Sequence, residues 1–474
     1  MQISNKLALI TLSMLAWCVC SSEPIKVVVL NDLHLDPYFD LTESVQEDCR
    51  GPTPFHLTGI KNTDYAPFGR YGWDVPSELI NLFIGKIKDL AFEPDVIIAS
   101  GDYTGHDIAA KKGKAHENYA ILKATISDCF SQYIGALFPN TIVIPAIGNN
   151  DAKWHYEFPL TKEDSQEYYG FLFDLWFDQL KGNVNYTKKD AIKKTFMEGG
   201  YFVYDYNNEI SFMCINSLYF SVKNAEYYSD VSKKQLDWIE NTLKKAGRKK
   251  KFILNMHVFP GMYNPGEKQQ FWEDEYNNRF DDIMKKYGDK VLMLNGAHTH
   301  ISDVRASYKI ETPASSKSFL KTPESEKIPY YANFVSPSIS PIFLNNPGFA
   351  SFNIDKTTIN NITMHFLELD MTYDIERTKN SKDVEFHSVN FEKEFGIKEW
   401  SPQAILDWKD RAQADDELFT KFLVLKLGYR MDQKEAALDV YKNLNMIDFE
   451  DGNKIYWCFF QYIRSDEYDE CVSS

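Results

Sequence analysis

Five short apolar runs in this chain each end in residues that can bind a metal ion. The runs lie at residues 27–30, 96–99, 142–147, 252–254 and 291–294. A short β-branched run that is bounded by polar residues or glycine predicts a buried strand. Because strands of an open α/β sheet present their carboxyl ends at one edge, we expect the residues that follow the runs to meet in one crevice.

The predicted metal donors are two aspartates, one asparagine and four histidines: Asp32, His34, Asp102, Asn149, His257, His298 and His300. These nitrogen and oxygen donors are of borderline hardness and suit a pair of divalent transition-metal ions. Each motif alone is weak evidence for a metal site, because a Gly-Asn-Asn sequence is usually a turn and a single histidine at a strand end is usually structural. Their recurrence after five strands favours a metal site.

Asp102 is the predicted bridging donor, because a carboxylate has two oxygens and can contact two cations. It follows Gly101, whose missing side chain permits a tight turn and a close approach of the backbone to the site.

The segments between the runs have helical patterns, which predicts an α/β layered fold. These segments are 76–90, 117–130, 164–180, 233–245 and 271–287. A hairpin is expected at 201–215 around Asn207-Asn208, and strands at 334–369, together forming a second, more antiparallel sheet behind the first. Charged helical patterns at 401–412, 416–427 and 434–444 predict a C-terminal helical subdomain. The expected division is a signal peptide at 1–22, a catalytic domain at 23–380 and the helical subdomain at 381–474.

The net charge of −16 argues against a nucleic-acid-binding surface, so an anionic substrate must be held locally. Lys6, an apolar stretch at 7–19 and small residues at 20–22 are typical of a secretory signal. The apolar stretch is shorter than the ~20 residues that a membrane span needs, and we expect no transmembrane segment. The protein is therefore expected in a secreted or lysosome- or vacuole-like location. Asn185 and Asn361 lie in glycosylation sequons.

The cysteines indicate one disulfide near the end of the chain. Cys458 and Cys471 flank a short segment and are the best candidates in an oxidising compartment. Cys214 lies within an apolar strand and is expected to be a buried free thiol. A bond between Cys49 and Cys129 stays open.

The donor motifs resemble those of the calcineurin-like metallophosphoesterases, whose pattern is D-x-H, G-D, G-N-[HN], an isolated His and H-x-H in that order. More narrowly, the chain resembles the acid sphingomyelinase-like phosphodiesterases. The matching segments are 32–37, 68–72, 100–107, 257–261, 298–300, 336–341 and 346–355. The resemblance covers nearly the whole chain after the signal segment.

The resemblance implies a two-sheet α/β sandwich that holds two divalent ions, usually zinc. One ion would be bound by Asp32, His34, Asp102 and His300, and the other by Asp102, Asn149, His257 and His298. A hydroxide that the ions activate would attack phosphorus in a phosphodiester or phosphoanhydride bond.

Three further residues are candidates for catalysis: His106, Asn150 and His155. His106 matches the family's positioned histidine and would protonate the leaving group; the alternative is a loop histidine bonded to Asp107. Asn150 stands where sphingomyelinase-type sequences usually have histidine, and an amide cannot supply a proton. His155, in the same loop, is a candidate to reach back into the site. Trp73 stands where relatives often have cysteine, which leaves Cys49 without its usual partner.

The first motif follows the signal segment closely, so no saposin domain is expected before it. The expected substrate is a soluble phosphodiester or nucleotide phosphate rather than membrane sphingomyelin, although a phospholipid headgroup stays open. The alternatives are a true sphingomyelin phosphodiesterase, an endopolyphosphatase, which the Gly-Asn-Asn-Asp motif also resembles, and a secreted binding protein or pseudoenzyme. We expect a monomer.

Overall fold

The structure is a computed structural model that describes residues 23–39, 68–90, 93–106, 108, 115–153, 155–156, 161–264, 269–311, 326–369, 386–444 and 453–474. The expected signal segment, Cys49 and Asp107 lie outside these residues.

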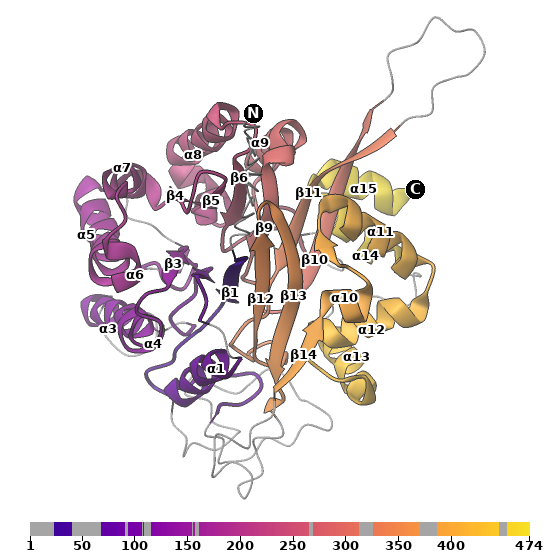
Figure 1. Ribbon diagram of the computed structural model, residues 1–474, viewed down its shortest axis with the longest axis horizontal. Coiled ribbons are helices and arrows are strands. Elements are labelled where there is room, and N and C mark those ends of the chain that lie inside the picture. The colour runs from indigo at the N-terminus through magenta and orange to yellow at the C-terminus, as the bar shows by residue number, and fades with distance from the viewer. Residues whose placement is uncertain are drawn as a thin grey trace, which may run out of the picture.

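Two large mixed sheets lie at the centre of the protein, with helices on both sides (Figure 1). The first has the order β14-β13-β12-β1-β2-β3, and β15 also pairs with β13. Its strands are β1 (Ile25–Leu30), β2 (Val96–Ala99), β3 (Ile142–Pro145), β12 (Gly348–Asp355), β13 (Thr358–Leu367), β14 (Phe386–Asn390) and β15 (Glu399–Trp400). The predicted two-sheet α/β architecture is confirmed.

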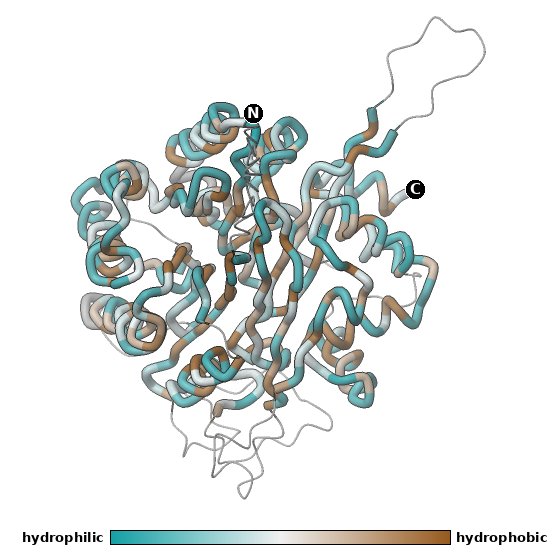
Figure 2. Tube along the Cα trace, in the orientation of Figure 1, coloured by the Kyte–Doolittle hydropathy of each residue, from teal (hydrophilic) through white to brown (hydrophobic). Residues whose placement is uncertain are grey.

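The second sheet has the order β10-β11-β9-β6-β5-β4. Its strands are β4 (Phe202–Asp205), β5 (Ile210–Cys214), β6 (Lys251–Asn255), β9 (Val291–Gly296), β10 (Asp303–Glu311) and β11 (Glu326–Val335). A small ribbon of β7 (Met262–Asn264) and β8 (Gln269–Gln270) follows β6. Hydrophobic residues are concentrated along the central strands (Figure 2), and side chains of both sheets share one buried core.

The donor-bearing strands belong to both sheets, which corrects the expectation of one shared sheet edge. β1, β2 and β3 are parallel neighbours in the first sheet, whereas β6 and β9 are parallel neighbours in the second. An apolar run shows that a strand is buried but not which strands flank it. The donors therefore come from the carboxyl ends of two parallel groups.

The expected membership of the second sheet is also wrong. The hairpin β4–β5 does join it, and so does β11, but β12 and β13 pair next to β1 in the first sheet. Both sheets are mixed because each combines a parallel group with antiparallel strands from the C-terminal half of the chain. Local sequence patterns carry no information about such long-range pairing.

The helices of the first 290 residues cover the outer faces of the sheets. They are α1 (Ser77–Asp89), α3 (Ala115–Asp128), α4 (Gly135–Leu137), α5 (Lys162–Phe173), α6 (Lys181–Val184), α7 (Lys189–Gly199), α8 (Ala225–Lys245) and α9 (Asp274–Tyr287). The five predicted helical segments are found with shifted ends, and the segment at 164–180 becomes α5 followed by a π-helical turn. Within the described residues, no helix is long and apolar enough to cross a membrane.

The C-terminal helices form a separate layer at the right of Figure 1. They are α10 (Phe391–Phe395), α11 (Pro402–Gln413), α12 (Asp416–Lys426), α13 (Lys434–Asn443), α14 (Lys454–Gln461) and α15 (Ser465–Ser473). The same part of the chain also supplies β14 and β15 to the first sheet.

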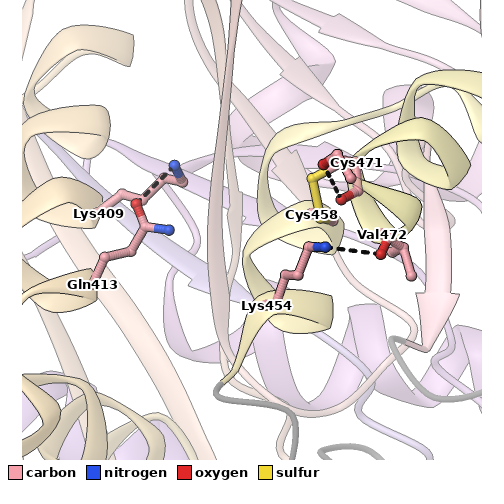
Figure 3. Close-up of a disulfide and its surroundings, with 7 residues drawn as sticks. Lys409, Gln413, Lys454, Cys458, Cys471 and Val472 are labelled. Carbon is pink, nitrogen blue, oxygen red and sulfur yellow. Dashed lines mark hydrogen bonds between the residues drawn. A yellow bond between two sulfur atoms is a disulfide. The ribbon is translucent and has the colours of Figure 1, made fainter.

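The predicted disulfide between Cys458 and Cys471 is present and joins α14 to α15 (Figure 3). Cys214 is a buried free thiol, as expected. Cys129 is also a buried free thiol, and it donates to the Tyr103 carbonyl. Cys49, the other residue of the pair that the sequence left open, lies outside the described residues.

Candidate metal centre

The donor side chains leave their strands through strained backbone turns. Positive φ angles occur at Asp32 (47°), His34 (44°), Asp102 (54°), His298 (77°) and His300 (61°). Non-glycine residues rarely adopt this left-handed conformation, and each instance costs of order 1–3 kcal/mol. These five residues follow β1, β2 and β9, three of the five strands that carry donors, and such strain is typical of functional sites.

Gly101 allows two of these turns to approach each other, as predicted. Its φ is +96°, and a Cβ atom there would lie 2.4 Å from the backbone nitrogen of Gly148. A Cβ atom at Gly148 would lie 2.1 Å from the backbone nitrogen of Asp102. The strand ends that carry Asp102 and Asn149 are thus in direct backbone contact.

Asp102 lies between donors from the two sheets. Its Oδ2 atom is 3.4 Å from Nε2 of His34 and 3.2 Å from Nε2 of His257. The His257 Nε2 atom is also 2.9 Å from Oδ1 of Asn149. Asp102 therefore occupies the central position that a bridging ligand requires.

Asp32 and His300 form the other side of the cluster. The His300 Nε2 atom is 3.7 Å from Oδ1 of Asp32, and Nε2 of His34 is 3.8 Å from the same oxygen. The backbone N–H of His298 donates to both Asp32 oxygens, at 3.2 and 3.3 Å. Asp32 thus connects the first strand end of one sheet with the His298-x-His300 turn of the other.

Several of the donors are oriented by outer hydrogen bonds. His257 Nδ1 lies 2.8 Å from the Ser100 carbonyl and donates to it, so Nε2 is the ring nitrogen that faces Asp102 and Asn149. His300 Nδ1 similarly contacts the Ser338 hydroxyl at 3.2 Å. His298 Nε2 lies 3.0 Å from the Tyr156 hydroxyl, which leaves its other ring nitrogen for an ion.

The residues fit a pair of divalent ions. His34 is fully buried, and neither of its ring nitrogens has a hydrogen-bond partner among the described residues. Such an orphaned buried polar group is costly unless something binds it. Potential ligand atoms lie within 4.8 Å of one another in three groups: Asp32 with His34 and Asp102, Asp102 with His257 and His298, and His34 with His106 and His300. Asp102 belongs to two of them.

The electrostatics keep Asp102, His298 and His300 in their ligating forms. Burial raises the pKa of Asp102, but His257 and His34 outweigh it and hold the pKa well below its usual value. Burial, with the neighbouring histidines, lowers the pKa of both His298 and His300 to about 3. At neutral pH the Asp102 carboxylate is ionised and these two imidazoles are neutral, which are the forms that bind metals. At the other two imidazoles burial lowers the pKa, but the neighbouring carboxylates outweigh it: they raise the pKa of His34 and raise the pKa of His257 to about 9, so an ion must displace a proton there.

His106 lies beside the cluster, stacked on His34 with ring centroids 4.2 Å apart. Its Nδ1 atom is 3.0 Å from Oδ1 of Asp74, and its backbone N–H donates to the same carboxylate. The partner of His106 is therefore Asp74; the alternative partner, Asp107, lies outside the described residues.

Asn150 and His155 both contact donors. The backbone N–H and the side-chain amide of Asn150 donate to the two oxygens of Asp102, each at 2.8 Å. Asn150 therefore orients the Asp102 carboxylate. The side-chain amide of Asn149 donates to Nε2 of His155 over 2.8 Å, so His155 does reach back to the cluster.

Sequence reasoning missed three supporting residues. Asp74 holds His106, and Tyr156 contacts His298, as described above. Asp151 accepts hydrogen bonds from the backbone N–H groups of Asp102, Tyr103 and Gly148, each at 2.8 Å, and so fixes the turn that presents Asp102. Only Asp151 lies in a recognised motif, Gly-Asn-Asn-Asp; the other two carry no local signal.

The family model of the calcineurin-like phosphoesterases matches residues 25–302, which include every donor of the cluster. The chain belongs to this family. The predicted superfamily is thereby confirmed, and with it a phosphoesterase fold around a candidate metal-binding cluster.

Similar proteins match most of the chain. Sphingomyelinase phosphodiesterase D of Dictyostelium discoideum is 26% identical, over 70% of this chain and 69% of the relative. Human acid sphingomyelinase-like phosphodiesterase 3b is 23% identical, over 79% and 80%. Cyclic GMP-AMP phosphodiesterase SMPDL3A of Rattus norvegicus is 23% identical, over 89% and 90%.

Proposed function

We propose that the protein is a secreted phosphodiesterase that works with two divalent metal ions, with Zn²⁺ as the ion. The observation that carries the proposal is the position of Asp102, which lies within 3.4 Å of a histidine from each sheet. In this proposal Asp32, His34, Asp102 and His300 hold one ion. Asp102, Asn149, His257 and His298 hold the other.

The ions, when bound, would supply Lewis acidity for the phosphoryl oxygens and lower the pKa of the attacking water. The protein's own groups would handle the leaving group. The N–H at Nδ1 of His106 donates to Asp74, so the second ring nitrogen is left to hold the proton that a leaving alkoxide needs. Asn150 has no such proton; its two bonds to Asp102 support a role in orienting that carboxylate.

We propose a soluble phosphodiester or nucleotide phosphate as the substrate. The net charge of −16 repels an anionic substrate at long range, so binding must come from the local cluster. Relatives include both sphingomyelinase-named and cyclic GMP-AMP-hydrolysing enzymes. The Cys458–Cys471 disulfide supports a secretory location, because disulfides persist in oxidising compartments.

A substrate panel tests the proposal. Purified protein would be assayed with a cyclic dinucleotide, CDP-choline, ATP, sphingomyelin in mixed micelles and long-chain polyphosphate, each with added Zn²⁺ and after chelation. We expect metal-dependent turnover of at least one of the first three and none of sphingomyelin. Preferred turnover of sphingomyelin or of polyphosphate would establish one of those activities instead. No turnover of any substrate by a fully metallated protein would favour a binding protein.

A further inference from the structure

Arg305 of β10 is a buried arginine that lies between two aromatic rings. Its guanidinium carbon is 4.5 Å from the ring centre of Phe259 and 3.7 Å from that of Phe459. Its Nη1 atom donates to the Met262 carbonyl over 3.1 Å. The nearest carboxylate, Asp303, is 3.8 Å away and is also bound by Lys426. Ring stacking and the Met262 bond, rather than a close ion pair, therefore fix the guanidinium.

The two rings belong to distant parts of the chain. Phe259 is two residues after the metal donor His257, whereas Phe459 lies in α14 beside the disulfide residue Cys458. Arg305 thus connects the disulfide-closed helix pair α14–α15 with the loop that follows His257.

Phe259 also contacts the second donor segment. A Cβ atom at Gly296 would lie 2.7 Å from the Phe259 ring, so this ring packs on the backbone two residues before His298. The backbone N–H of Ala297 donates to the His257 carbonyl over 2.9 Å. Displacing Phe259 would therefore change the spacing between His257 and His298.

A second connection runs through Asn277 of α9. Its Oδ1 atom accepts from the backbone N–H of Gly261 at 3.1 Å, and its Nδ2 atom donates to the Ile463 carbonyl at 2.6 Å. Gly261 has a φ of +103°. The end of α14 and the loop after His257 are thus joined at two points, one on each side of Pro260.

We propose that Arg305 is a positioning residue that couples the α14–α15 pair to the His257 loop and so sets the affinity for one of the two metal ions. The inference rests on the proposed two-ion function. In this inference the C-terminal helix pair supports the binding site of one ion, the ion bound through Asp102, Asn149, His257 and His298. The other ion, bound through Asp32, His34, Asp102 and His300, takes no ligand from the His257 loop and does not depend on this coupling.

The test compares Arg305→Met with Lys426→Met. Lys426 is a second buried cation beside Asp303, and it donates to Asp303 and Tyr456. Among the described residues, no contact between Lys426 and the His257 loop is found. Metal content would be followed by competition with a graded chelator, on protein shown to be folded by circular dichroism. We expect Arg305→Met to weaken the binding of one ion by up to about 10-fold and to leave the binding of the other unchanged. This is the lower end of the scale for residues that hydrogen-bond a metal ligand, because Arg305 acts through Phe259. Lys426→Met should lower the melting temperature but retain both affinities.

Three further variants extend the test, and the first two keep it decisive if Arg305→Met fails to fold. Arg305→Lys keeps a cation between the rings but loses the planar stacking, so it should restore only part of the affinity. Phe459→Leu removes the ring on α14 and should weaken the binding of the same ion. His257→Ala should weaken the binding of that ion as well. Adding Arg305→Met to His257→Ala should cause no further loss of affinity.

The outcomes separate this inference from the proposed function. Wild-type protein that binds fewer than two ions would refute the two-ion proposal itself. Wild-type protein that binds two ions, with Arg305→Met and Phe459→Leu binding both as tightly, would overturn only the coupling.

Discussion

Two regions of the protein differ in their local backbone and hydrogen-bond geometry: the strand ends that carry the donors, and the C-terminal helices. At the strand ends, five donor residues have positive φ angles and a buried histidine has no hydrogen-bond partner among the described residues. In the helices, Ser401 caps α11 and Asp415 caps α12 through side-chain hydrogen bonds, and a disulfide joins α14 to α15. The difference teaches where local preferences are broken: non-glycine residues with positive φ cluster at the strand ends that would bind a ligand, whereas the described C-terminal helical region has one, Asn453 before α14.

The largest expected effect in this comparison is at Asp102. Asp102→Asn should abolish turnover, because an amide cannot bridge two cations as a carboxylate does. The matched control is Asp415→Asn, which makes the same chemical change at a helix cap. Steady-state rates on the best substrate of the panel check both, and near-normal turnover by Asp102→Asn would refute the bridging assignment.

His106 should matter only when the leaving group needs a proton. His106→Ala is expected to slow hydrolysis of an alkyl phosphodiester by about 10²–10⁴-fold. Hydrolysis of a p-nitrophenyl ester should change far less, because p-nitrophenolate leaves without protonation. The ratio of the two rate losses is the measurement, and equal losses on both substrates would remove His106 from this role.

The smallest expected effect is in the scaffold. Asp415 accepts hydrogen bonds from the N–H groups of Glu417 and Leu418 at 3.0 and 3.1 Å. Asp415→Ala should reduce the free energy of unfolding by about 1 kcal/mol and leave turnover unchanged, whereas Asn should retain the cap. Denaturant unfolding and an activity assay would show this, and a loss of activity without a loss of stability would contradict the division between the two regions.

The sequence predicted strands and donor residues correctly where an apolar run is followed directly by residues that can bind a metal ion. The apolar runs before Asp32, Asp102 and His257 are strands, and Gly101, which was predicted to permit a tight turn, has a φ of +96°. Pairing over long distances could not be read in this way. β12 follows the last donor by many residues yet lies beside β1, because register and partner depend on tertiary packing.

The supporting residues of the site could not be predicted either, because their contacts also join distant parts of the chain. Asp74 reaches His106 from a different loop, 32 residues earlier, and Tyr156 contacts His298 across 142 residues. An isolated aspartate or tyrosine in a loop has no distinctive spacing. The coupling of α14 to the His257 loop likewise depends on where Arg305 meets two rings that are 200 residues apart in the chain.

Metal analysis of the purified protein tests the central claim most directly. Mass spectrometry of the wild-type protein after gel filtration with Zn²⁺ should find two tightly bound ions per chain, and Asp102→Asn should retain fewer. One ion or none in a folded wild-type protein would contradict the account, as would two ions that persist at unchanged affinity in Asp102→Asn.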